Sequence, residues 1–347
     1  MSIKKLTQIA KIEILVYMDF TCPKVSVIIA VYKVEKYIER CLHSLFGQTL
    51  DYLEYIFVDD ASPDSSMRIV ERILEEYPHR KSQVNIIRHS KNKGIAGTRK
   101  DGILAATGEY IIHCDPDDYV DLEMYEELYN EAKRKDADIV VCDYYKEKEN
   151  SHLLCAIKYE NSAKKILAKM SKGGHFAGGP LWNFLTRRSI IITNKILPIP
   201  HADFEEDSLC RIITLYYSDR VSYINKPFYH YCVRADSLTA GRNSMVSQQF
   251  QFYDQNIQSL IKFFEDKEDF QNLVNLLKLR IKFLARHLYR EKDEKGWFNL
   301  NKEAHIAIFS CREIPRIQRI FWAFSFSNYL VYKMGLALYT KIKGKPF

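Results

Sequence analysis

Two hydrophobic periods alternate along the first 145 residues of the chain. Continuous apolar runs rich in β-branched residues are typical of buried strands, and we expect strands at residues 25–32, 53–60, 84–89, 109–115 and 138–145. Apolar positions at helical spacing predict helices at residues 35–46, 64–77, 96–107 and 122–137. Strands that alternate with helices of this length predict an α/β fold, with a mostly parallel sheet and helices on both faces.

The alternation weakens after residue 150. A helix is expected at 158–170, and a second one, which opens with four acids, at 203–217. Residues 221–233 are strand-like, but the central Pro227 restricts them to an edge or a turn. From about residue 245 onward the chain is helical, aromatic and increasingly basic, which predicts a helical C-terminal region.

Carboxylates cluster where two of the expected strands end. Asp59 and Asp60 follow one strand, and Asp115, Asp117 and Asp118 follow another in the stretch IIHCDPDDY. Ligands of such sheets bind at the carboxyl ends of the strands, and buried carboxylates are costly unless they bind something. Mg²⁺ and Mn²⁺ prefer oxygen ligands, usually with a substrate phosphate. We interpret the second cluster as a metal and anion site, with a solvated turn as the alternative.

A glycine-rich loop in KNKGIAGTRKDG lies between the two acidic clusters. Gly94 and Gly97 precede a helix, and Arg99 and Lys100 fall in its first turns. Glycines let the backbone approach a ligand, and a helix N-terminus with a cation favours phosphate, so Gly94 and Arg99 are candidate anion-binding residues. The loop is neither GxGxxG nor a P-loop, so a dinucleotide site or an NTPase is poorly supported.

Composition and charge exclude several classes. A chain of 347 residues with 47% hydrophobic residues is globular, and a net charge of +7 from interspersed charges gives no nucleic-acid footprint. Eight cysteines without a CxxC pair indicate reduced thiols in a cytosolic protein. The N-terminus lacks the features of a signal peptide, and Met18 is an alternative start because the first strand begins at Val25.

Three ordered motifs carry a family resemblance. VSVIIAVYKVEKYIERCLHSLFGQT, FVDDASPDSS and NKGIAGTRKDGILAATGEYIIHCDPDDYVD resemble the family-2 glycosyltransferases over residues 24–145. PLWNFLTRRSI, FEEDSLC and PFYHYCVRADSLT further along are similar to acceptor-side segments of the bacterial members that build capsule, O-chain and exopolysaccharide. The resemblance implies a GT-A fold.

The resemblance also implies a domain organisation. We expect an N-terminal extension at 1–23 and a GT-A domain at 24–240, followed by a helical C-terminal region at 241–347. Within the GT-A domain, residues 24–145 would be the donor half and 146–240 the acceptor half.

On the donor side, the resemblance implies that Tyr32 and the backbone near Val31 meet the nucleotide base. Asp60 would accept a hydrogen bond from the base, with Asp59 close by. It further implies that Asp115 faces the ribose or the sugar, and that Asp117 binds the Mg²⁺ or Mn²⁺ ion that bridges the diphosphate.

On the acceptor side, Asp207, preceded by Glu206, matches the family's Glu-Asp pair, whose Asp serves as catalytic base. Residues 205–207 have an alternative interpretation as a charged helix start favoured by the helix dipole. Trp182 either stacks on an acceptor sugar or plugs an interface.

The chain departs from the family pattern at a few positions, none of which is a carboxylate. The family usually has Pro at Ala30, Asn at Lys33, Gly at Ala61 and Ala-Arg-Asn at residues 98–100. The processive-synthase signature QxxRW is absent, and no apolar stretch has spanning length, which favours single addition over polymerisation in the membrane.

The tail of the chain suggests a membrane surface. An uncharged aromatic run extends from Ile320 to Tyr332, and from Arg312 onward seven basic residues face one acidic residue, Glu313. Such a segment can lie in a membrane interface and attract anionic lipid, which would suit a peripheral enzyme at the cytoplasmic face. The alternative is a helix packed on the protein's own core.

The favoured function is therefore an inverting, metal-dependent transfer of a sugar, with UDP as the expected donor nucleotide, to a glycan or lipid-linked acceptor. A catalytically degenerate relative that binds nucleotide or glycan is one alternative. A sugar-nucleotide pyrophosphorylase is another, but its glycine-rich signature should follow the first strand, where this chain has AVYKVEKY.

Overall fold

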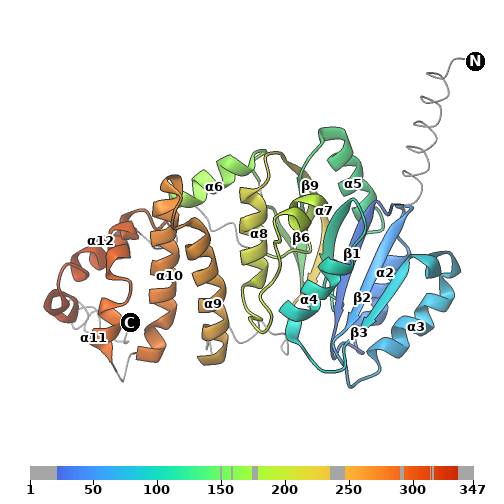
Figure 1. Cartoon of the computed structure of the whole chain (residues 1–347), viewed down its shortest axis with the longest axis horizontal. Helices are drawn as coiled ribbons and strands as arrows, with labels where there is room; N and C mark the ends of the chain where they lie inside the picture. The colour runs from blue at the N-terminus through green and yellow to red at the C-terminus, as the bar shows by residue number, and fades with distance from the viewer. Residues whose placement is uncertain are drawn as a thin grey trace, which may run out of the picture. The chain divides into compact units, whose positions relative to one another are not determined.

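The structure, a computed structural model, describes residues 22–148, 151–157, 159–173, 179–234, 247–289, 293–312, 314 and 316–334 (Figure 1). The chain divides into two compact units that interleave in sequence. The sheet unit comprises residues 1–161, 180–201 and 217–240, and the helical unit comprises 162–179, 202–216 and 241–347. The sequence predicted a single boundary at residue 240. In the structure, the segments 162–179 and 202–216, which precede that boundary, belong to the same unit as the C-terminal helices. The alternative start at Met18 lies outside the described residues.

The sheet unit contains the strands that the sequence predicts. Their order in the sheet is β3-β2-β1-β4-β8-β6-β9-β5, with β7 paired to β6. Pairing is parallel within β3-β2-β1-β4 and between β6 and β9. The predicted strands are β1 (Val25–Val31), β2 (Leu53–Asp59), β3 (Val84–Arg88), β4 (Tyr110–Cys114), β6 (Ile139–Lys148) and β9 (Val221–Cys232).

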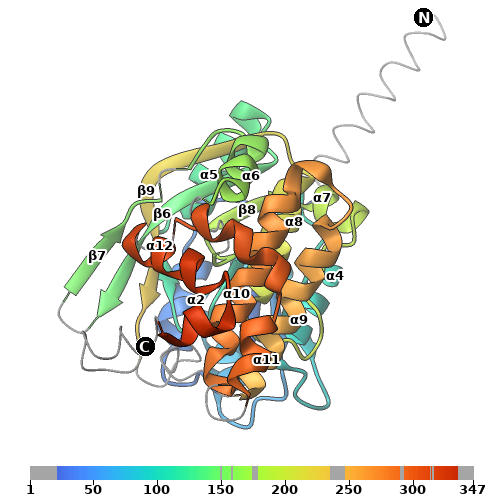
Figure 2. The same cartoon turned by 90° about the vertical axis from the view of Figure 1, so that its left-hand side faces the viewer.

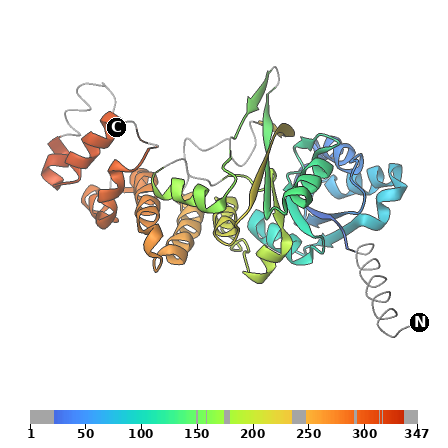
Figure 3. The same ribbon diagram turned by 90° about the horizontal axis from the view of Figure 1, so that it is seen from above.

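Three further strands have no counterpart in the sequence prediction. β8 (Phe184–Arg187) runs antiparallel between β4 and β6, and β5 (Tyr119–Val120) pairs with the end of β9. β7 (Ser151–Cys155) forms a hairpin with β6 that extends beyond the other strands (Figures 2 and 3). All three strands are too short to show a clear hydrophobic period, and β5 and β8 pair with residues that are distant in the chain.

Pro227 sits where the register of β9 shifts against β6, opposite Asp143. β5 pairs with β9 only at residues 229–230, so the proline lies beyond that short ladder. The sequence predicted an edge or a turn at Pro227. The structure keeps Pro227 within β9, at a register shift and outside the ladder with β5, which fits the edge alternative because proline cannot donate to a regular ladder.

Helices cover the two faces of the sheet according to the alternation of side chains along β1. Val27 and Ile29 belong to the core that includes α2 (Ile38–Phe46), α3 (Ser66–Glu76) and α5 (Met124–Lys135). Ile28 points to the other face, where α4 (Gly94–Ala105) packs against β1 and β2. A Cβ atom at Gly102 of α4 would lie 2.4 Å from Ile28 Cγ2, so this close approach requires glycine. Figure 1 shows α4 on the side of β1 and β2 opposite to α2 and α3.

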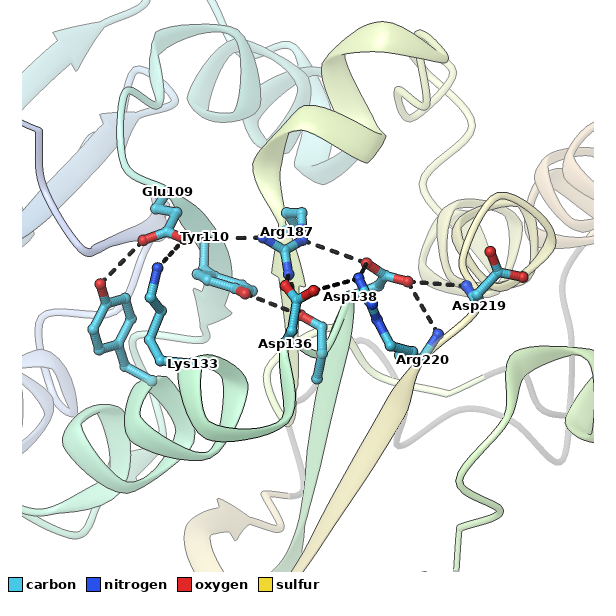
Figure 4. Close-up of polar contacts among 10 residues, drawn as sticks. Glu109, Tyr110, Lys133, Asp136, Asp138, Arg187, Asp219 and Arg220 are labelled. Atoms are coloured by element: carbon cyan, nitrogen blue, oxygen red, sulfur yellow. Dashed lines mark hydrogen bonds and ion pairs between the residues drawn. The ribbon is translucent and has the colours of Figure 1, made fainter. Parts of the chain in front are cut away.

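A network of ion pairs and hydrogen bonds lies at the end of the sheet where β6 and β9 begin (Figure 4). Asp138 accepts hydrogen bonds from the backbone N–H groups of Asp219 and Arg220, both at 3.0 Å. Arg187 forms ion pairs with Asp138 at 3.4 Å and with Asp136 at 2.8 Å. These acids are matched by cations and backbone donors within the unit, so this edge reads as structural.

The helical unit packs around aromatic side chains. Trp297, Trp322, Phe326 and Tyr332 are at least 96% buried in one cluster. Its helices and 3₁₀ turns are α6 (Ala163–Ser171), α8 (Glu206–Tyr216), α9 (Ser247–Phe264), η3 (Glu268–Phe270), α10 (Gln271–Tyr289), α11 (Glu294–Asn299), η4 (Lys302–Phe309) and α12 (Arg316–Ser325).

The sequence left two alternatives for the C-terminal segment, packing on the protein's own core or contact with a membrane surface. Different residues of the segment fit each of them. Trp322 and Tyr332 belong to the core of the helical unit, as the packing alternative predicts. Leu330 and Met334 are 71% and 74% exposed, which leaves apolar surface for an interface. Residues 335–347 lie outside the described part of the chain. None of the helices in the described ranges combines the length and the apolar character needed to cross a bilayer.

Candidate active site

Three adjacent parallel strands bring the predicted donor-side residues to one edge. Val31 at the end of β1 pairs in register with Asp59 at the end of β2, and Ile29 pairs with Cys114 at the end of β4. The acids after β2 and after β4 therefore flank the end of β1, as the sequence predicts for the carboxyl edge of a parallel sheet.

Asp60 holds the glycine-rich loop in place. Its side chain is 4% exposed and accepts from the backbone N–H of Lys93 at 2.7 Å and of Gly94 at 3.0 Å. A carboxylate at this position is favoured by the N-terminus of α4, which begins at Gly94 with φ of 76°. The Asp60 N–H donates to Val31 O at 3.0 Å, which ties the end of β1 to the same loop. The expected contact with a nucleotide base remains a prediction.

His89 bridges this loop to α4. Its Nδ1 lies 2.7 Å from Asp60 Oδ1 and its Nε2 lies 3.0 Å from Asp101 Oδ2, while the ring is 3% exposed. Burial tends to raise the pKa of Asp101, but hydrogen bonds and charges from Lys93 and His89 outweigh this and lower it. The sequence interpretation assigned no role to His89. Its position directly after β3, at the carboxyl end of a strand, is the feature of the sequence that could have identified it.

The turn after β1 presents an aromatic ring and is hydrogen-bonded to the turn after β2. Asp59 Oδ1 accepts from Ser62 N at 2.9 Å, and Ser62 Oγ accepts from Lys33 N at 2.8 Å. Tyr32 is 40% exposed, with the Lys33 ammonium 5.1 Å from its ring centre. An exposed ring on a fixed turn fits the expected contact with a planar base.

The stretch CDPDDY forms a turn that sends its carboxylates in different directions. The N–H of Asp118 donates to the carbonyl of Asp115 at 3.1 Å, and Pro116 occupies the second position, which its fixed φ favours. Asp118 is 1% exposed and accepts from Tyr229 Oη and Cys232 N, both at 2.7 Å. Burial, followed by the charges of its neighbours, holds the pKa of Asp118 well above its usual range. Asp118 therefore anchors the turn to β9.

Asp115 and Asp117 point to arginines. Asp115 Oδ1 accepts from Arg99 Nη2 at 2.9 Å, and their side chains are 29% and 6% exposed. Asp117 pairs with Arg234, and both side chains are 18% exposed. Burial raises the pKa of Asp117, the charge of Asp115 raises it further, and Arg234 partly offsets both. Two neighbouring carboxylates repel each other unless positive charge lies nearby. Arginines supply that charge here, and a divalent metal ion bound to the carboxylates could supply it as well.

Within the described ranges, no group of three or more His, Cys, Asp or Glu side chains forms a ready metal cage. Mg²⁺ sites typically use one or two carboxylates and draw other ligands from water and substrate phosphates. The oxygen donors of Asp115 and Asp117 match this type of site, and Asp117 retains some exposure. The donor set thus fits the predicted Mg²⁺ or Mn²⁺ ion.

Trp182 is 5% exposed and stacks on Tyr229, with ring centres 4.0 Å apart and planes at 9°. It also contacts Tyr144 edge to face at 4.9 Å. An indole with so little surface supports the packing alternative, and it does not support direct stacking on an acceptor sugar. Tyr229 in turn accepts from Asp115 N at 3.1 Å, so this stack lies directly behind the acidic turn.

The predicted acceptor-side acids lie in the helical unit. α8 begins at Glu206, and Glu205 before it has φ of 65°, a left-handed conformation. Glu206 is 6% exposed, whereas Asp207 in the same first turn is partly exposed. Acids in a first helical turn also fit the helix-start interpretation, so the base role of Asp207 remains a prediction.

The sequence interpretation assigned no role to Tyr229 or Arg234, although both lie in the quoted segment PFYHYCVRADSLT. A tyrosine in a strand and an arginine after it are common, and only the pairing of β9 beside the acidic turn reveals their contacts.

This sheet order and acidic edge define a fold of the GT-A class, and solved structures agree. Staphylococcus aureus TarS residues 1–349 in complex with UDP-GlcNAc superposes with a TM-score of 0.68 over 93% of this chain and 92% of that chain, at 16% identity. A mannosyltransferase from Pyrobaculum calidifontis in complex with GDP-Man and Mn²⁺ gives 0.51 over 93% and 88%, also at 16% identity. At these identities the likeness describes the fold.

Sequence comparison identifies the family. The model of the family described as Glycosyl transferase family 2 matches residues 26–193. An uncharacterized glycosyltransferase, EpsJ of Bacillus subtilis, is 33% identical over 224 residues, or 62% of this chain and 63% of that protein. The cholesterol galactosyltransferase of Borreliella burgdorferi is 32% identical over 230 residues, or 62% of each chain. The alignments span less than two thirds of these relatives' own length. Residues 26–193 therefore form a family-2 glycosyltransferase domain.

Proposed function

We propose that this chain is an inverting, metal-dependent glycosyltransferase that uses a UDP-sugar and works in bacterial surface polysaccharide synthesis. The observation that carries the proposal is the pair Asp115 and Asp117, which follows β4 beside the turn of Asp59 and the exposed ring of Tyr32. The complexes of similarly folded proteins with UDP-GlcNAc and with GDP-Man and Mn²⁺ support a nucleotide-sugar at this type of edge.

The donor would occupy the edge in a defined way. Tyr32 packs against the base, and the Asp60-anchored loop presents Gly94 near the phosphates. Asp117, with Asp115, would hold a Mg²⁺ or Mn²⁺ ion, and such an ion would supply positive charge for the leaving diphosphate. Arg99 and Arg234 supply positive charge next to these acids.

Transfer then needs one base and one displacement. The carboxylate of Asp207 takes the proton of the acceptor hydroxyl as its oxygen bonds to the anomeric carbon. The bond from that carbon to the diphosphate breaks on the opposite face, so the configuration inverts. Glu206, one residue earlier, belongs to the acceptor side of the same reaction.

The acceptor is a glycan or a lipid-linked saccharide, and the enzyme is cytoplasmic and peripheral to the inner membrane surface. The exposed Leu330 and Met334 and the basic residues from Arg312 onward support such a surface. The cholesterol galactosyltransferase among the relatives carries a lipid acceptor in its name.

The decisive experiment is thermal melting with UDP, GDP or CMP, each with and without Mn²⁺. A ligand at a hundredfold excess over its Kd stabilises the folded state by about 2.7 kcal/mol, so UDP with Mn²⁺ should raise the Tm of the wild type. Asp117→Ala should lose this rise, and Asp51→Ala, which removes an exposed acid elsewhere in the sheet unit, should keep it.

Turnover separates an enzyme from a degenerate binding protein. UDP release from UDP-sugars should occur in the wild type and fall at least a hundredfold in Asp207→Asn, with the UDP and Mn²⁺ shift retained. Binding without turnover with any UDP-sugar and acceptor would favour the degenerate alternative, and the absence of any nucleotide shift would reject the donor site.

A further inference from the structure

A cavity of about 430 Å³ lies within the helical unit. Leucines of α10 form much of its wall, with Met170 of α6 and Trp322 of α12 completing it. Voids in packed protein cores seldom exceed a water molecule, whereas pockets for small organic ligands begin at about 300 Å³. The size of this cavity is therefore that of a binding site.

The lining has the composition of a site for a hydrocarbon chain. Leu273, Leu277 and Leu279 of the wall are each at most 2% exposed. Trp322, also in the wall, is 1% exposed. A hydrocarbon chain that enters a lining of this kind leaves water, which is favourable.

A few polar groups interrupt the apolar wall. Gln318 of α12 and Arg280 of α10 line the same cavity. The Arg280 side chain is 29% exposed and lies 3.9 Å from Glu205, near the outer limit of an ion pair. A mostly apolar pocket with few polar groups is typical of a site that orients an amphiphilic ligand.

The charge around one wall is positive. The segment 311–322 contributes Cys311, Ile314, Gln318 and Trp322 to the lining. The same segment carries Arg312, Arg316 and Arg319 against a single acid, Glu313, in the sequence. Arg312 and Arg316 are exposed, so an anionic group near the cavity would meet a favourable field.

We propose that this cavity binds the hydrocarbon tail of a single-chain amphiphile with an anionic headgroup. If each methylene takes roughly the 30 Å³ of a water molecule, the cavity of about 430 Å³ holds a chain of up to about fourteen carbons. The headgroup then lies toward Arg280 and the basic segment. This site is separate from sugar transfer and does not depend on the proposed function.

The rival occupant is the chain's own tail. Residues 335–347, outside the described part, include Leu336, Leu338 and Tyr339. A tail in the cavity would exclude added amphiphile from the full chain, and its removal would admit it. The experiment below distinguishes the two.

Tryptophan fluorescence of the full chain, titrated with 11-bromoundecanoate, is the direct test, because bromine quenches an indole that it touches. Trp322 lines the cavity, so saturable quenching is expected, and it should be lost in Trp322→Phe. Dodecyl phosphate should reverse the quenching. Dodecyltrimethylammonium should do so at least about tenfold less effectively.

Two variants of α10 supply the matched control. Leu276→Phe adds bulk to the lining and should weaken binding at least about tenfold. Asn275→Phe adds a ring to the preceding residue, which does not line the cavity, and should leave binding unchanged. Absence of saturable quenching, equal effects of the two variants, or binding only after removal of residues 335–347 would overturn the proposal.

Discussion

At the scale of single residues, two positions beside the acidic edge hold a backbone conformation that their side chains disfavour. Lys33 and Ala61 both have φ of 53°, in the left-handed region. Glycine reaches this region freely and asparagine more easily than most residues, because a Cβ atom crowds the backbone there. The family resemblance places Asn and Gly at these two positions, so the departures in this chain coincide with its strained residues.

Ala61→Gly should therefore stabilise the sheet unit. Relief of the left-handed strain outweighs the extra freedom of glycine in the unfolded chain, and we expect a gain of about 1 kcal/mol in the free energy of unfolding. Urea denaturation measures it. Ala105→Gly, in the helical conformation at the end of α4, is the control and should lose up to about 1 kcal/mol. A loss in both variants would contradict the strain argument.

His89 is the second residue with a predictable effect. It lies between the carboxylates of Asp60 and Asp101, with 3% of its side chain exposed. His89→Leu leaves two acids without this partner, and a buried hydrogen-bonding group that loses its partner costs about 1–3 kcal/mol. Because Asp60 anchors Lys93 and Gly94, the stabilisation by UDP and Mn²⁺ should also shrink.

Denaturation and melting of His89→Leu should be compared with those of His79→Leu, which changes an exposed histidine and should leave both quantities near the wild type. If His89→Leu unfolded like His79→Leu, the bridge would have no role in holding the loop.

At the scale of elements, a buried lysine of one helix caps the C-terminal end of another. Lys282 of α10 is fully buried, and its ammonium donates to the carbonyls of Trp297 at 2.9 Å and Leu300 at 2.8 Å, and also to that of Phe298. The last carbonyls of a helix lack partners within it, so the lysine closes α11 from outside. Burial lowers the pKa of Lys282 to about 7.

This pKa predicts a pH dependence of stability. Between about pH 7 and 10 the unfolded chain keeps the lysine proton while the folded chain has lost it, so the unfolded state binds more protons and stability rises with pH. Lys282→Met should remove this contribution. Urea denaturation across this range, compared between the two proteins, cancels the other titrating groups; parallel curves would show that the ammonium stays charged in the fold.

At the scale of the whole molecule, the charge is uneven. The chain carries a net +7, and seven basic residues against one acid lie from Arg312 onward. Arg312 and Arg316 are exposed, as are the apolar Leu330 and Met334. Each basic residue near an anionic bilayer contributes about 1 kcal/mol, which makes this end of the chain the expected contact with lipid.

Vesicle co-sedimentation tests this surface. Arg312→Glu with Arg316→Glu reverses two such charges, and the loss of the two positive charges alone should weaken binding to vesicles rich in phosphatidylserine by about thirtyfold. Lys36→Glu with Lys91→Glu changes the net charge equally in the sheet unit and should have a smaller effect. Equal losses of binding in the two double variants would mean that only the total charge of the protein matters. Equally strong binding of the wild type to neutral vesicles would exclude an electrostatic contribution.

The sequence by itself determined the repeating strands and helices of the first half and the edge that carries the acids. Both follow from local rules, because side-chain periodicity reports which face is buried and because parallel strands end at a common edge. The choice of Asp59, Asp60, Asp115 and Asp117 as residues of one edge needed no further information.

Only the tertiary structure decided how those residues are used. Asp118 became an anchor and Asp117 an ion-pair partner through Tyr229 and Arg234, which lie 111 and 117 positions away in the chain. The burial of Trp182 against Tyr229 and the interleaving of the two units also rest on such distant contacts. Local periodicity specifies which side of an element is buried, but the partner it meets depends on where the rest of the chain returns.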